Sequence, residues 1–411
     1  MRMTTVDLSL DKLIRGQLGY MNQYFDVVGV AADTGLLSGV AEREGVRVID
    51  VPMHREIALG ADMKSLVHLV KLFRKEKPDI LHCNTPKGSL LGLIAGKLTG
   101  IPNRVYTVTG LRYQGATGLL RWVLKTMERI SCACATKVIP EGQGVLHTLL
   151  VDGITRKPLA VLHHGNINGI DTGMYSNEAL AKELGLTEDA NRVGDGMATD
   201  EVNEKNEREE LWQRGVSALM REKLGFTADD FVFVFVGRIV KDKGINELAQ
   251  CMRQLDCKLI LVGSFDDDDP INDFDREFLE TSPKVKWVGW QEDVRPYLAM
   301  SDALVFPSYR EGFPNVPIQA GAMGKPCIVT DINGCNEIIK DGLNGKIIAA
   351  PLADGSEAMT TALQNTMQWF ISHLEEVRRM SKNARGMITS RYEQQDVWRA
   401  TYEMYRQLLA T

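Results

Sequence analysis

Two cations stand in a glycine-bounded turn directly after a predicted buried strand. The apolar run Phe231–Val236 leads into Gly-Arg-Ile-Val-Lys-Asp-Lys-Gly, which starts at Gly237. This spacing matches neither the dinucleotide fingerprint nor the P-loop. A guanidinium and an ammonium at the end of a strand, with glycines that let the backbone approach a ligand, can neutralise a diphosphate without a metal ion. Arg238 and Lys243 are therefore predicted to bind phosphate, and surface cations in an ordinary turn are the alternative.

A carboxylate opens a second motif, which follows a predicted strand and begins a predicted helix. From position 308 the sequence is Ser-Tyr-Arg-Glu-Gly-Phe-Pro-Asn-Val-Pro-Ile-Gln-Ala. Glu311 lies in the turn, and Gly312 lets the chain bend so that backbone N–H groups can hold an anion or a sugar oxygen. Gln319 is polar amid apolar neighbours on the helix. It needs a partner, either a ligand hydroxyl or a group on another helix.

Two further polar groups have competing interpretations. The run Asp266–Asp269 could bind Mg²⁺ or Mn²⁺, because these ions prefer carboxylate oxygens, but a solvated acidic loop after Gly263 is the favoured interpretation. His163 and His164 stand at a predicted strand end without an evident carboxylate partner in the sequence, so packing is their expected role. We therefore expect neither a metal site nor a cofactor.

Strands and helices alternate in two series along the chain. Buried strands are predicted at Phe25–Ala31, Val46–Val51, Ile80–Asn84, Arg104–Val108, Lys137–Pro140 and Leu159–His164, with Met1–Val6 as a short first strand. The second series is Phe231–Val236, Lys258–Gly263, Val285–Val288, Ala303–Pro307, Pro326–Thr330 and Lys346–Ile348. Such alternation is typical of parallel sheets covered by helices on both faces. We expect an α/β protein with two doubly wound domains whose crevices face a central cleft.

The domain boundaries follow from composition. The first domain is expected over residues 1–177 and the second over 222–391, with a polar inserted linker at 178–221 that is rich in Glu, Asp, Asn and Lys. The closing segment Ser356–Leu409 is predicted to be helical throughout. Its last helix, at about 392–411, is expected to pack back on the first domain.

Composition excludes several classes of protein. The chain has 411 residues, more than one hydrophobic core usually serves, and it is 44% hydrophobic and 25% charged, as globular proteins are. The net charge of −6 is uneven, because residues 1–175 carry 21 Lys and Arg against 15 Asp and Glu. The basic half could face phosphates or anionic lipid headgroups, or be a solvated surface, and nucleic acid is not expected as a partner. The seven cysteines show no Cys-x-x-Cys pair and fit reduced thiols in the cytoplasm.

Any membrane contact is expected to be peripheral, because no apolar run approaches the roughly 20 residues that span a bilayer. The basic helical segments Lys71–Lys77 and Leu120–Arg129, the latter with Trp122, could lie on a membrane surface. Ordinary amphipathic helices that cover a sheet are the alternative. We expect a cytoplasmic protein, with a peripheral position on the inner face of the membrane as the further option.

The second half of the chain resembles glycosyltransferase family 4, the group 1 retaining glycosyltransferases of the GT-B fold with two Rossmann-like domains. Beside the two motifs above, the resemblance rests on Val288–Trp290, Asp293–Tyr297, Met323–Pro326, Gly334–Ile339, Asp341-Gly342 and Asn344-Gly345. The first half is similar to the family more loosely, through Leu81–Lys87, Thr107–Gly110 and Asn168–Asp171.

The resemblance implies a metal-independent, retaining glycosyltransferase. It would move a sugar from a nucleotide-sugar substrate, preferably a UDP-sugar, to a lipid-linked or saccharide acceptor in surface polysaccharide or glycolipid biosynthesis. By this resemblance Arg238 and Lys243 hold the donor diphosphate and Glu311 touches the sugar hydroxyls, so these three are the expected catalytic residues. The remaining donor-binding residues are expected to be Gly237, Gly312, Phe313, the ribose-side Gln319, and Trp290 and Gln291 beside the base.

Two positions depart from the family pattern. Gln319 stands where a second glutamate usually grips the ribose, and an amide can bond to a diol only without the strength of a charge. Thr109 stands where many relatives carry histidine, so that histidine's contact with the donor sugar is not transferred. On the acceptor side we expect Lys87, Thr109 and Arg112. A nucleotide-sugar epimerase on the same fold and a non-catalytic nucleotide-sugar-binding protein remain the alternatives.

Overall fold

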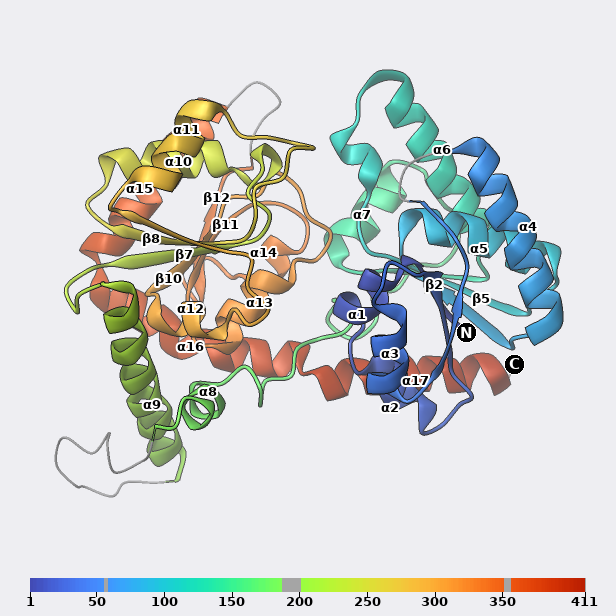
Figure 1. Ribbon diagram of the computed structural model, residues 1–411, viewed down its shortest axis with the longest axis horizontal. Coiled ribbons are helices and arrows are strands. Elements are labelled where there is room, and N and C mark those ends of the chain that lie inside the picture. The colour runs from blue at the N-terminus through green and yellow to red at the C-terminus, as the bar shows by residue number, and fades with distance from the viewer. Residues whose placement is uncertain (55–57, 187–200, 351–355, 411) are drawn as a thin grey trace. The chain divides into compact units, whose positions relative to one another are not determined.

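The computed structural model describes residues 1–54, 58–186, 201–350 and 356–410. The chain divides into two compact units (Figure 1). The first unit consists of Met1–Gly169 together with Gln394–Thr411, and the second of Ile170–Glu393. Each unit is built on a six-stranded sheet in which all strand pairs are parallel. The predicted α/β class with two doubly wound domains is therefore confirmed.

The first sheet has the strand order β3-β2-β1-β4-β5-β6. Its strands are β1 Arg2–Val6, β2 Val28–Ala32, β3 Arg47–Asp50, β4 Ile80–Cys83, β5 Asn103–Val108 and β6 Lys137–Pro140. Its helical elements are α1 Asp7–Leu13, α2 Gln17–Asn22, α3 Leu37–Glu44, α4 Leu59–Glu76, α5 Pro86–Leu98, the 3-10 turn η1 Arg112–Gly115, α6 Gly118–Cys134, α7 Gln143–Val151 and α17 Gln394–Ala410. Five of the strands were predicted as buried runs, and Met1–Val6 does supply the first. The burial of β3 was predicted wrongly, because this strand lies at the sheet edge and exposes Arg47 and Asp50.

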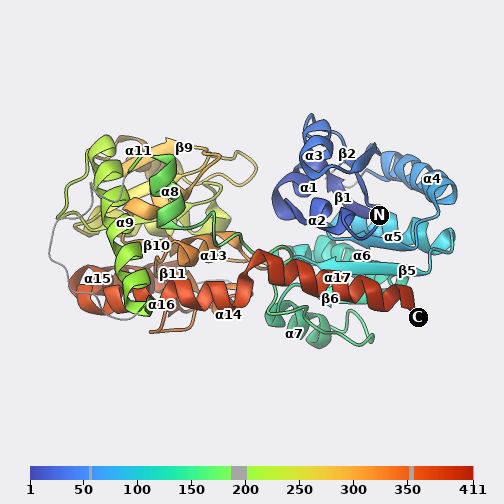
Figure 2. The ribbon, with the colours of Figure 1, turned by 90° about the horizontal axis from the view of Figure 1, so that it is seen from below.

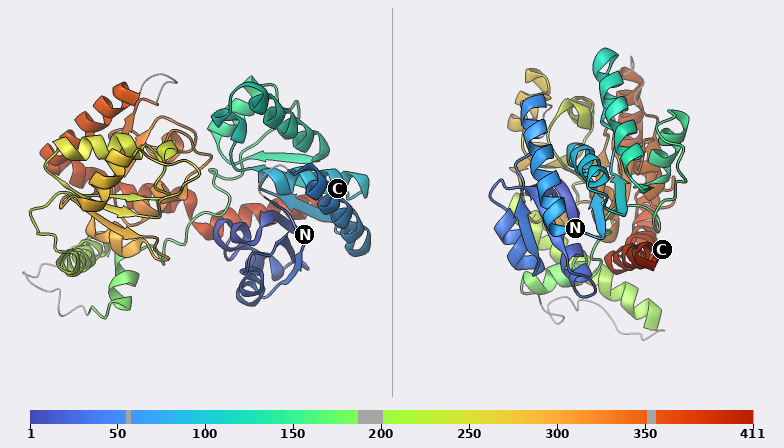
Figure 3. Two further views of the ribbon diagram at one scale, coloured as in Figure 1. Left: turned by 45° about the horizontal axis from the view of Figure 1, so that its top comes forward. Right: turned by 90° about the vertical axis from the view of Figure 1, so that its right-hand side faces the viewer.

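Helices cover the first sheet on both faces. One buried cluster joins side chains of α4, α5 and α6 to the sheet, and α5 contacts both of the other helices. These helices, coloured blue to teal, lie side by side in Figure 3. A second cluster joins α1, α2 and α3 to Trp398 of α17, and Figure 2 shows α17 passing across the strands. Trp398 donates its indole N–H to Asn168 Oδ1 at 2.7 Å, which ties the end of the chain to this unit.

The second sheet has the strand order β12-β11-β10-β7-β8-β9. Its strands are β7 Val232–Val236, β8 Lys258–Val262, β9 Val285–Gly289, β10 Ala303–Phe306, β11 Cys327–Thr330 and β12 Gly345–Ile348. The helices are α8 Asn177–Glu183, α9 Glu201–Leu224, α10 Ile245–Gln254, α11 Asp273–Thr281, α12 Arg295–Met300, α13 Asn315–Ala322, α14 Cys335–Ile338, α15 Ser356–Ser372 and α16 Leu374–Tyr392, with the 3-10 turn η3 Lys241–Lys243. In Figure 1, α10, α11 and α15 lie on one side of the strands and α12, α13 and α16 on the other.

Two expectations differ from the structure, and a third is confirmed with two breaks. The predicted strand Leu159–His164 is wrong, because only Leu159 forms a bridge, to Val138, and the chain then turns at His163 with φ of 53°. The closing segment is helical as predicted, in three helices that are interrupted only at His373 and Glu393. The polar segment at 178–221 begins and ends in helices α8 and α9 of the second unit, whose core includes Leu180, Trp212 and Val216. Trp212 and Val216 are four positions apart, so they lie on the same face of α9. Residues 187–200 of that segment lie outside the described residues.

Gly244 lets the turn after β7 pack against the end of β10. Its φ is +71°, and a Cβ atom there would lie 2.1 Å from the carbonyl oxygen of Pro307. Gly342 has a similar φ of +74°, yet a Cβ atom there would meet nothing within 4 Å. The two glycines therefore separate the cost of the left-handed backbone from the cost of a collision.

We expect Gly342→Ala to destabilise the fold by about 1 kcal/mol, from backbone strain alone. Gly244→Ala adds a collision with backbone that cannot move aside, so a loss of about 3 kcal/mol or more is expected. Denaturant unfolding of both variants measures the difference. Equal losses for the two variants would contradict the close approach of Gly244 to Pro307.

Candidate functional site

The predicted donor-binding residues follow neighbouring strands of the second sheet. Parallel strands bring their carboxyl ends to one edge, which is where open α/β sheets bind ligands. Arg238 and Lys243 follow β7, Trp290 and Gln291 follow β9, and Glu311 follows β10. Because β10, β7, β8 and β9 are consecutive in the sheet, their loops are adjacent along this edge.

Lys243 and Glu311 are in contact. The Nζ atom of Lys243 forms an ion pair and hydrogen bond with Glu311 Oε1, across 68 positions of sequence. Their side chains are 16% and 15% exposed, so the pair is half-buried. The ammonium also lies 5.7 Å from the centre of the Phe306 ring, at the end of β10. The predicted cation and the predicted carboxylate are therefore brought together at the end of the central strands.

Arg238 is held differently. Its guanidinium Nη1 lies 2.9 Å from Asp266 Oδ2, which belongs to the loop after β8, and the Arg238 side chain is 61% exposed. An exposed ion pair of this kind is worth little in water and exchanges partners readily. Arg238 can therefore reach an incoming anion.

Backbone packing shapes the turn at Glu311. Gly334, with φ of +73°, lies so close to this turn that a Cβ atom would approach the Gly312 carbonyl oxygen and Phe313 Cα to 2.7 Å each. Phe313 is buried, and its ring lies 5.6 Å from that of Tyr392. Helix α13 then starts after Pro314, which supplies no side-chain cap. Gly312 and Phe313 are thus part of a tightly packed turn that leads into a helix start.

Gln319 has a protein partner. Its amide nitrogen donates to the hydroxyl of Tyr175 at 2.9 Å, and both residues belong to the second unit. Tyr175 lies in the bend before α8, so the observed partner is a protein group, although not one on another helix as expected. The predicted contact of Gln319 with a ribose stays a prediction.

Trp290 and Gln291 lie directly after β9. The Trp290 side chain is exposed, at 64%, so its indole face is open to a planar ligand. Gln291 is turned back on its own strand end, since its amide nitrogen donates to the Val288 carbonyl oxygen at 2.7 Å. Only Trp290 of the two presents its side chain to solvent.

The acidic run after β8 is used within the protein. Asp266 pairs with Arg238, and Asp269 Oδ2 accepts the backbone N–H of Asp242 at 2.8 Å. Within the described residues, no group of three or more His, Cys, Asp or Glu side chains is arranged to hold a metal ion. The imidazole rings of His163 and His164 pack edge to face, with their centres 4.5 Å apart.

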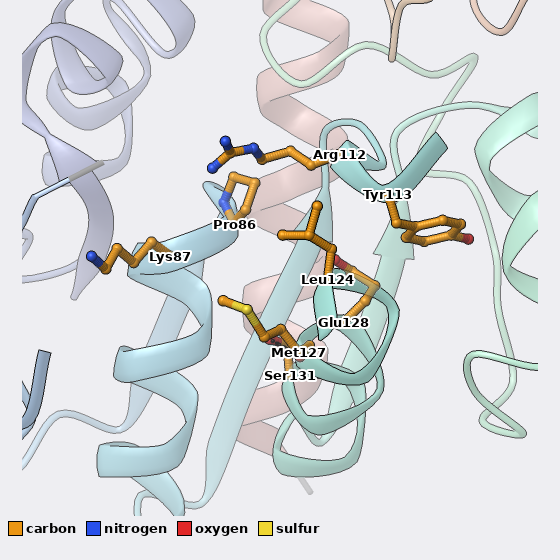
Figure 4. A pocket seen from close by; sticks show the side chains of 8 residues that line it. All are labelled: Pro86, Lys87, Arg112, Tyr113, Leu124, Met127, Glu128 and Ser131. Atoms are coloured by element: carbon orange, nitrogen blue, oxygen red, sulfur yellow. Dashed lines mark hydrogen bonds between the residues drawn. The ribbon is translucent and has the colours of Figure 1, made fainter. Parts of the chain in front are cut away.

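On the first unit, the three expected acceptor-side residues lie after β4 and β5 but face different surroundings. Lys87 is buried and pairs with Asp62 Oδ1 at 2.6 Å, while Thr109 donates to the Asn84 carbonyl oxygen at 2.8 Å. Lys87 and Arg112 line a small pocket with Pro86, Tyr113, Leu124, Met127, Glu128 and Ser131. Figure 4 shows the charged ends of Lys87 and Arg112 pointing away from Tyr113 and Glu128.

Sequence reasoning missed Asn84 and Glu128. Asn84 follows β4 and is only 1% exposed, yet both polar atoms of its side chain lack a hydrogen-bond partner among the described residues. A buried amide without a partner is rare, and its place after a buried strand was the available signal. Glu128 is buried in the pocket of Figure 4, where Oε1 accepts the Tyr106 hydroxyl at 2.7 Å. The only sign of Glu128 in the sequence was a single acidic residue among apolar residues of a predicted helix.

Two family models match the chain. The model described as glycosyl transferases group 1 matches residues 216–387, and the glycosyl transferase 4-like domain matches residues 19–165. The first match contains every predicted donor-binding residue, and the second contains Lys87, Thr109 and Arg112.

Curated relatives and solved structures extend the likeness to nearly the whole chain. The capsular polysaccharide biosynthesis glycosyltransferase CapM of Staphylococcus aureus is 29% identical, over 99% of this chain and 96% of its own. The UDP-Gal:alpha-D-GlcNAc-diphosphoundecaprenol alpha-1,3-galactosyltransferase of Escherichia coli is 27% identical, over 80% and 77%. The crystal structure of Anabaena HepE in complex with UDP matches with a TM-score of 0.71, 19% identity and 99% of both chains covered, which shows a shared fold.

Glu128 predicts a measurable pH dependence of stability. Burial raises the pKa of this carboxyl from 4.5 to about 7, while the Tyr106 hydroxyl bond opposes the shift. Between these two values the unfolded chain releases the proton and the folded chain keeps it, so this group's contribution to stability is lost as pH rises towards 7. We expect Glu128→Gln to change stability little at pH 4.5 and to raise it by roughly 3 kcal/mol at pH 8.

Denaturant unfolding of both proteins at the two pH values measures this difference. Glu76→Gln is the matched control, because its half-buried carboxyl bonds to Arg47, which lowers the pKa of Glu76. That variant should gain no stability at pH 8. A pH-independent difference between Glu128→Gln and the natural protein would contradict a neutral Glu128.

Proposed function

This chain belongs to the group 1 glycosyltransferases of family 4 type, with the GT-B fold, and we propose that it is a retaining enzyme that uses a UDP-sugar. The acceptor would be a lipid-linked or other saccharide in surface polysaccharide or glycolipid biosynthesis. The observation that carries the proposal is the contact between Lys243 and Glu311 at the end of β7 and β10, with Arg238 on the same edge.

Arg238 and Lys243 are proposed to bind the donor diphosphate. Glycosyl transfer leaves negative charge on the departing diphosphate, so cations near its oxygens lower the barrier. Both residues are paired with carboxylates in this structure, Arg238 with Asp266 and Lys243 with Glu311. A phosphate oxygen accepts the same charge-assisted hydrogen bonds from Arg and Lys as a carboxylate oxygen does. This similarity supports a binding step in which the diphosphate replaces the carboxylates.

Glu311 is proposed to bind hydroxyls of the donor sugar. It lies beside Lys243, so a sugar diphosphate bound with its phosphates at the ammonium would place the sugar near the carboxylate and the start of α13. Trp290, with its exposed indole, is proposed to pack on the base, with Gln291 beside it, and Gln319 to approach the ribose. UDP is the proposed nucleotide, and the UDP complex of the Anabaena protein, which has a similar fold, is consistent with this choice.

A front-face displacement is proposed for the chemical step. The transition state carries positive charge at the anomeric carbon, and the departing diphosphate lies on the face that the acceptor approaches. The sequence offers no evident nucleophile for a two-step route. Isolation of a covalent sugar adduct on the enzyme would exclude the front-face route.

A peripheral position on an anionic membrane is proposed for the first unit. Within the described residues, no helix combines the length and the apolar character needed to cross a bilayer. Helix α6 exposes Leu119, Leu120 and Trp122 at its start, with side chains of 77% exposure for Leu119 and 62% for Trp122. Its only acid, Glu128, is buried, whereas Arg121 is exposed. Apolar side chains beside cations bind an anionic lipid surface, which is where a lipid-linked acceptor would be found.

The proposed donor site predicts that removing either of its two cations weakens UDP binding strongly. Arg238→Ala and Lys243→Ala should each weaken UDP binding by roughly 10- to 100-fold, because each removes charge-assisted hydrogen bonds to phosphate. Arg399→Ala is the control, since this exposed arginine of the first unit pairs with Asp396 on α17. Thermal shift against a series of UDP and GDP concentrations measures the change. Unchanged UDP binding in both variants would contradict the donor site.

The proposed membrane contact of α6 predicts that removing its exposed apolar side chains reduces lipid binding and leaves nucleotide binding unchanged. A variant with Leu119, Leu120 and Trp122 all changed to Ser should sediment with vesicles of anionic phosphatidylglycerol at least several-fold less than the natural protein. Phe274→Ser with Leu343→Ser removes two exposed apolar side chains of the second unit and should have no effect. Equal sedimentation of the α6 variant and the natural protein would contradict membrane binding by α6.

A further inference from the structure

The loops after β7 and β8 are joined by their backbones. Gly237 N donates to Val262 O at 3.0 Å, Ile239 N to Ser264 O at 2.9 Å and Lys241 N to Asp269 O at 3.1 Å. The approach is so close that a Cβ atom on Gly263, at φ of +143°, would lie 1.8 Å from the Gly237 carbonyl oxygen. The acidic run therefore has a defined position against the turn that carries Arg238.

Within this run, Asp266 has a carboxylate that is held from two sides. Its Oδ1 accepts the backbone N–H of Asp268 at 3.0 Å, and its Oδ2 lies 2.9 Å from Arg238 Nη1. The Asp268 N–H, followed by the Arg238 guanidinium, lowers the pKa of Asp266. The carboxylate is thus ionised at neutral pH and is kept next to Arg238 by its own loop.

We propose that Asp266 is a built-in counter-ion that competes with the donor diphosphate for Arg238. The inference rests on the proposed function, in which Arg238 binds that diphosphate. A carboxylate and a phosphate present similar oxygen pairs to a guanidinium, so both occupy the same donors. A diphosphate that reaches Arg238 also brings negative charge towards Asp266, and the repulsion raises the cost of binding.

This competition acts on donor and product alike, because both carry the diphosphate. Once the sugar has been transferred, the nucleoside diphosphate leaves and Asp266 again pairs with Arg238. The carboxylate thereby lowers the affinity for donor and product by the same factor, and it replaces the departing diphosphate at the guanidinium. Asp266 is a residue that sets affinity, and it takes no part in the bond changes.

The neighbouring acids offer a matched control. Asp267 is exposed and differs from Asp266 by one position, and Asp267→Asn removes the same charge without removing the contact with Arg238. Asp269 is unsuitable, since its side chain accepts the Asp242 N–H and joins the two loops.

The test compares Asp266→Asn, Asp267→Asn, Arg238→Ala and the double variant Arg238→Ala with Asp266→Asn. Calorimetric titration uses whichever of UDP and GDP the natural protein binds more tightly, with the matching nucleoside as a second probe. We expect Asp266→Asn to tighten nucleoside diphosphate binding about two- to fivefold, the range of an exposed ion pair. Asp267→Asn should tighten it less, the nucleoside should bind all proteins equally, and the tightening should vanish in the Arg238→Ala background. Thermal unfolding checks that each variant is folded.

Three results would overturn the proposal. Weaker binding by Asp266→Asn would mean that Asp266 orients Arg238 for the ligand. Equal effects of Asp266→Asn and Asp267→Asn would reflect general charge, and a tightening that persists without Arg238 would exclude competition for this guanidinium. Failure of the donor site itself has a different signature, because neither nucleotide would then bind or Arg238→Ala would leave their affinity unchanged.

Discussion

The proposed donor site depends on one constraint, the alignment of parallel strands in the second sheet. Strands β10, β7, β8 and β9 are neighbours and end at the same edge, so the four loops that follow them are adjacent. Glycines without side chains let these loops touch backbone to backbone, at Gly244 beside Pro307 and at Gly263 beside Gly237. Side chains far apart in the sequence are thereby held at fixed positions on a rigid sheet, as a preorganised site requires.

Charge compensation is the second property of this edge. Lys243 contacts Glu311 and Arg238 contacts Asp266, so each proposed phosphate ligand has a carboxylate partner in the protein. The half-buried pair avoids the cost of an isolated charge away from water. The exposed pair is weaker and more readily exchanged. In the proposed function, binding of a diphosphate is an exchange of anions at cations that the fold has already placed.

The two units share a sheet plan but offer different surfaces at their carboxyl edges. In the first unit the Lys87 ammonium is buried against Asp62, and Asn84 is a buried amide without a partner among the described residues. Its helix α6 places apolar side chains in solvent beside Arg121. The carboxyl edge of the first sheet therefore has both polar and apolar side chains, whereas that of the second sheet has paired charges. This difference fits the proposed binding of the acceptor by the first unit and of the donor by the second.

The sequence by itself located the strands, because most of them are short β-branched or apolar runs. It also located Arg238, Lys243 and Glu311, since each follows such a run. It failed at Leu159–His164, where an apolar start resembles a strand but the chain turns. Only the tertiary structure decided that Lys243 meets Glu311, that Asp266 meets Arg238 and that Gln319 meets Tyr175. Local sequence patterns indicate which residues are buried and whether a segment is a helix or a strand. A side chain's partner depends instead on which distant strands are neighbours and how closely their loops pack.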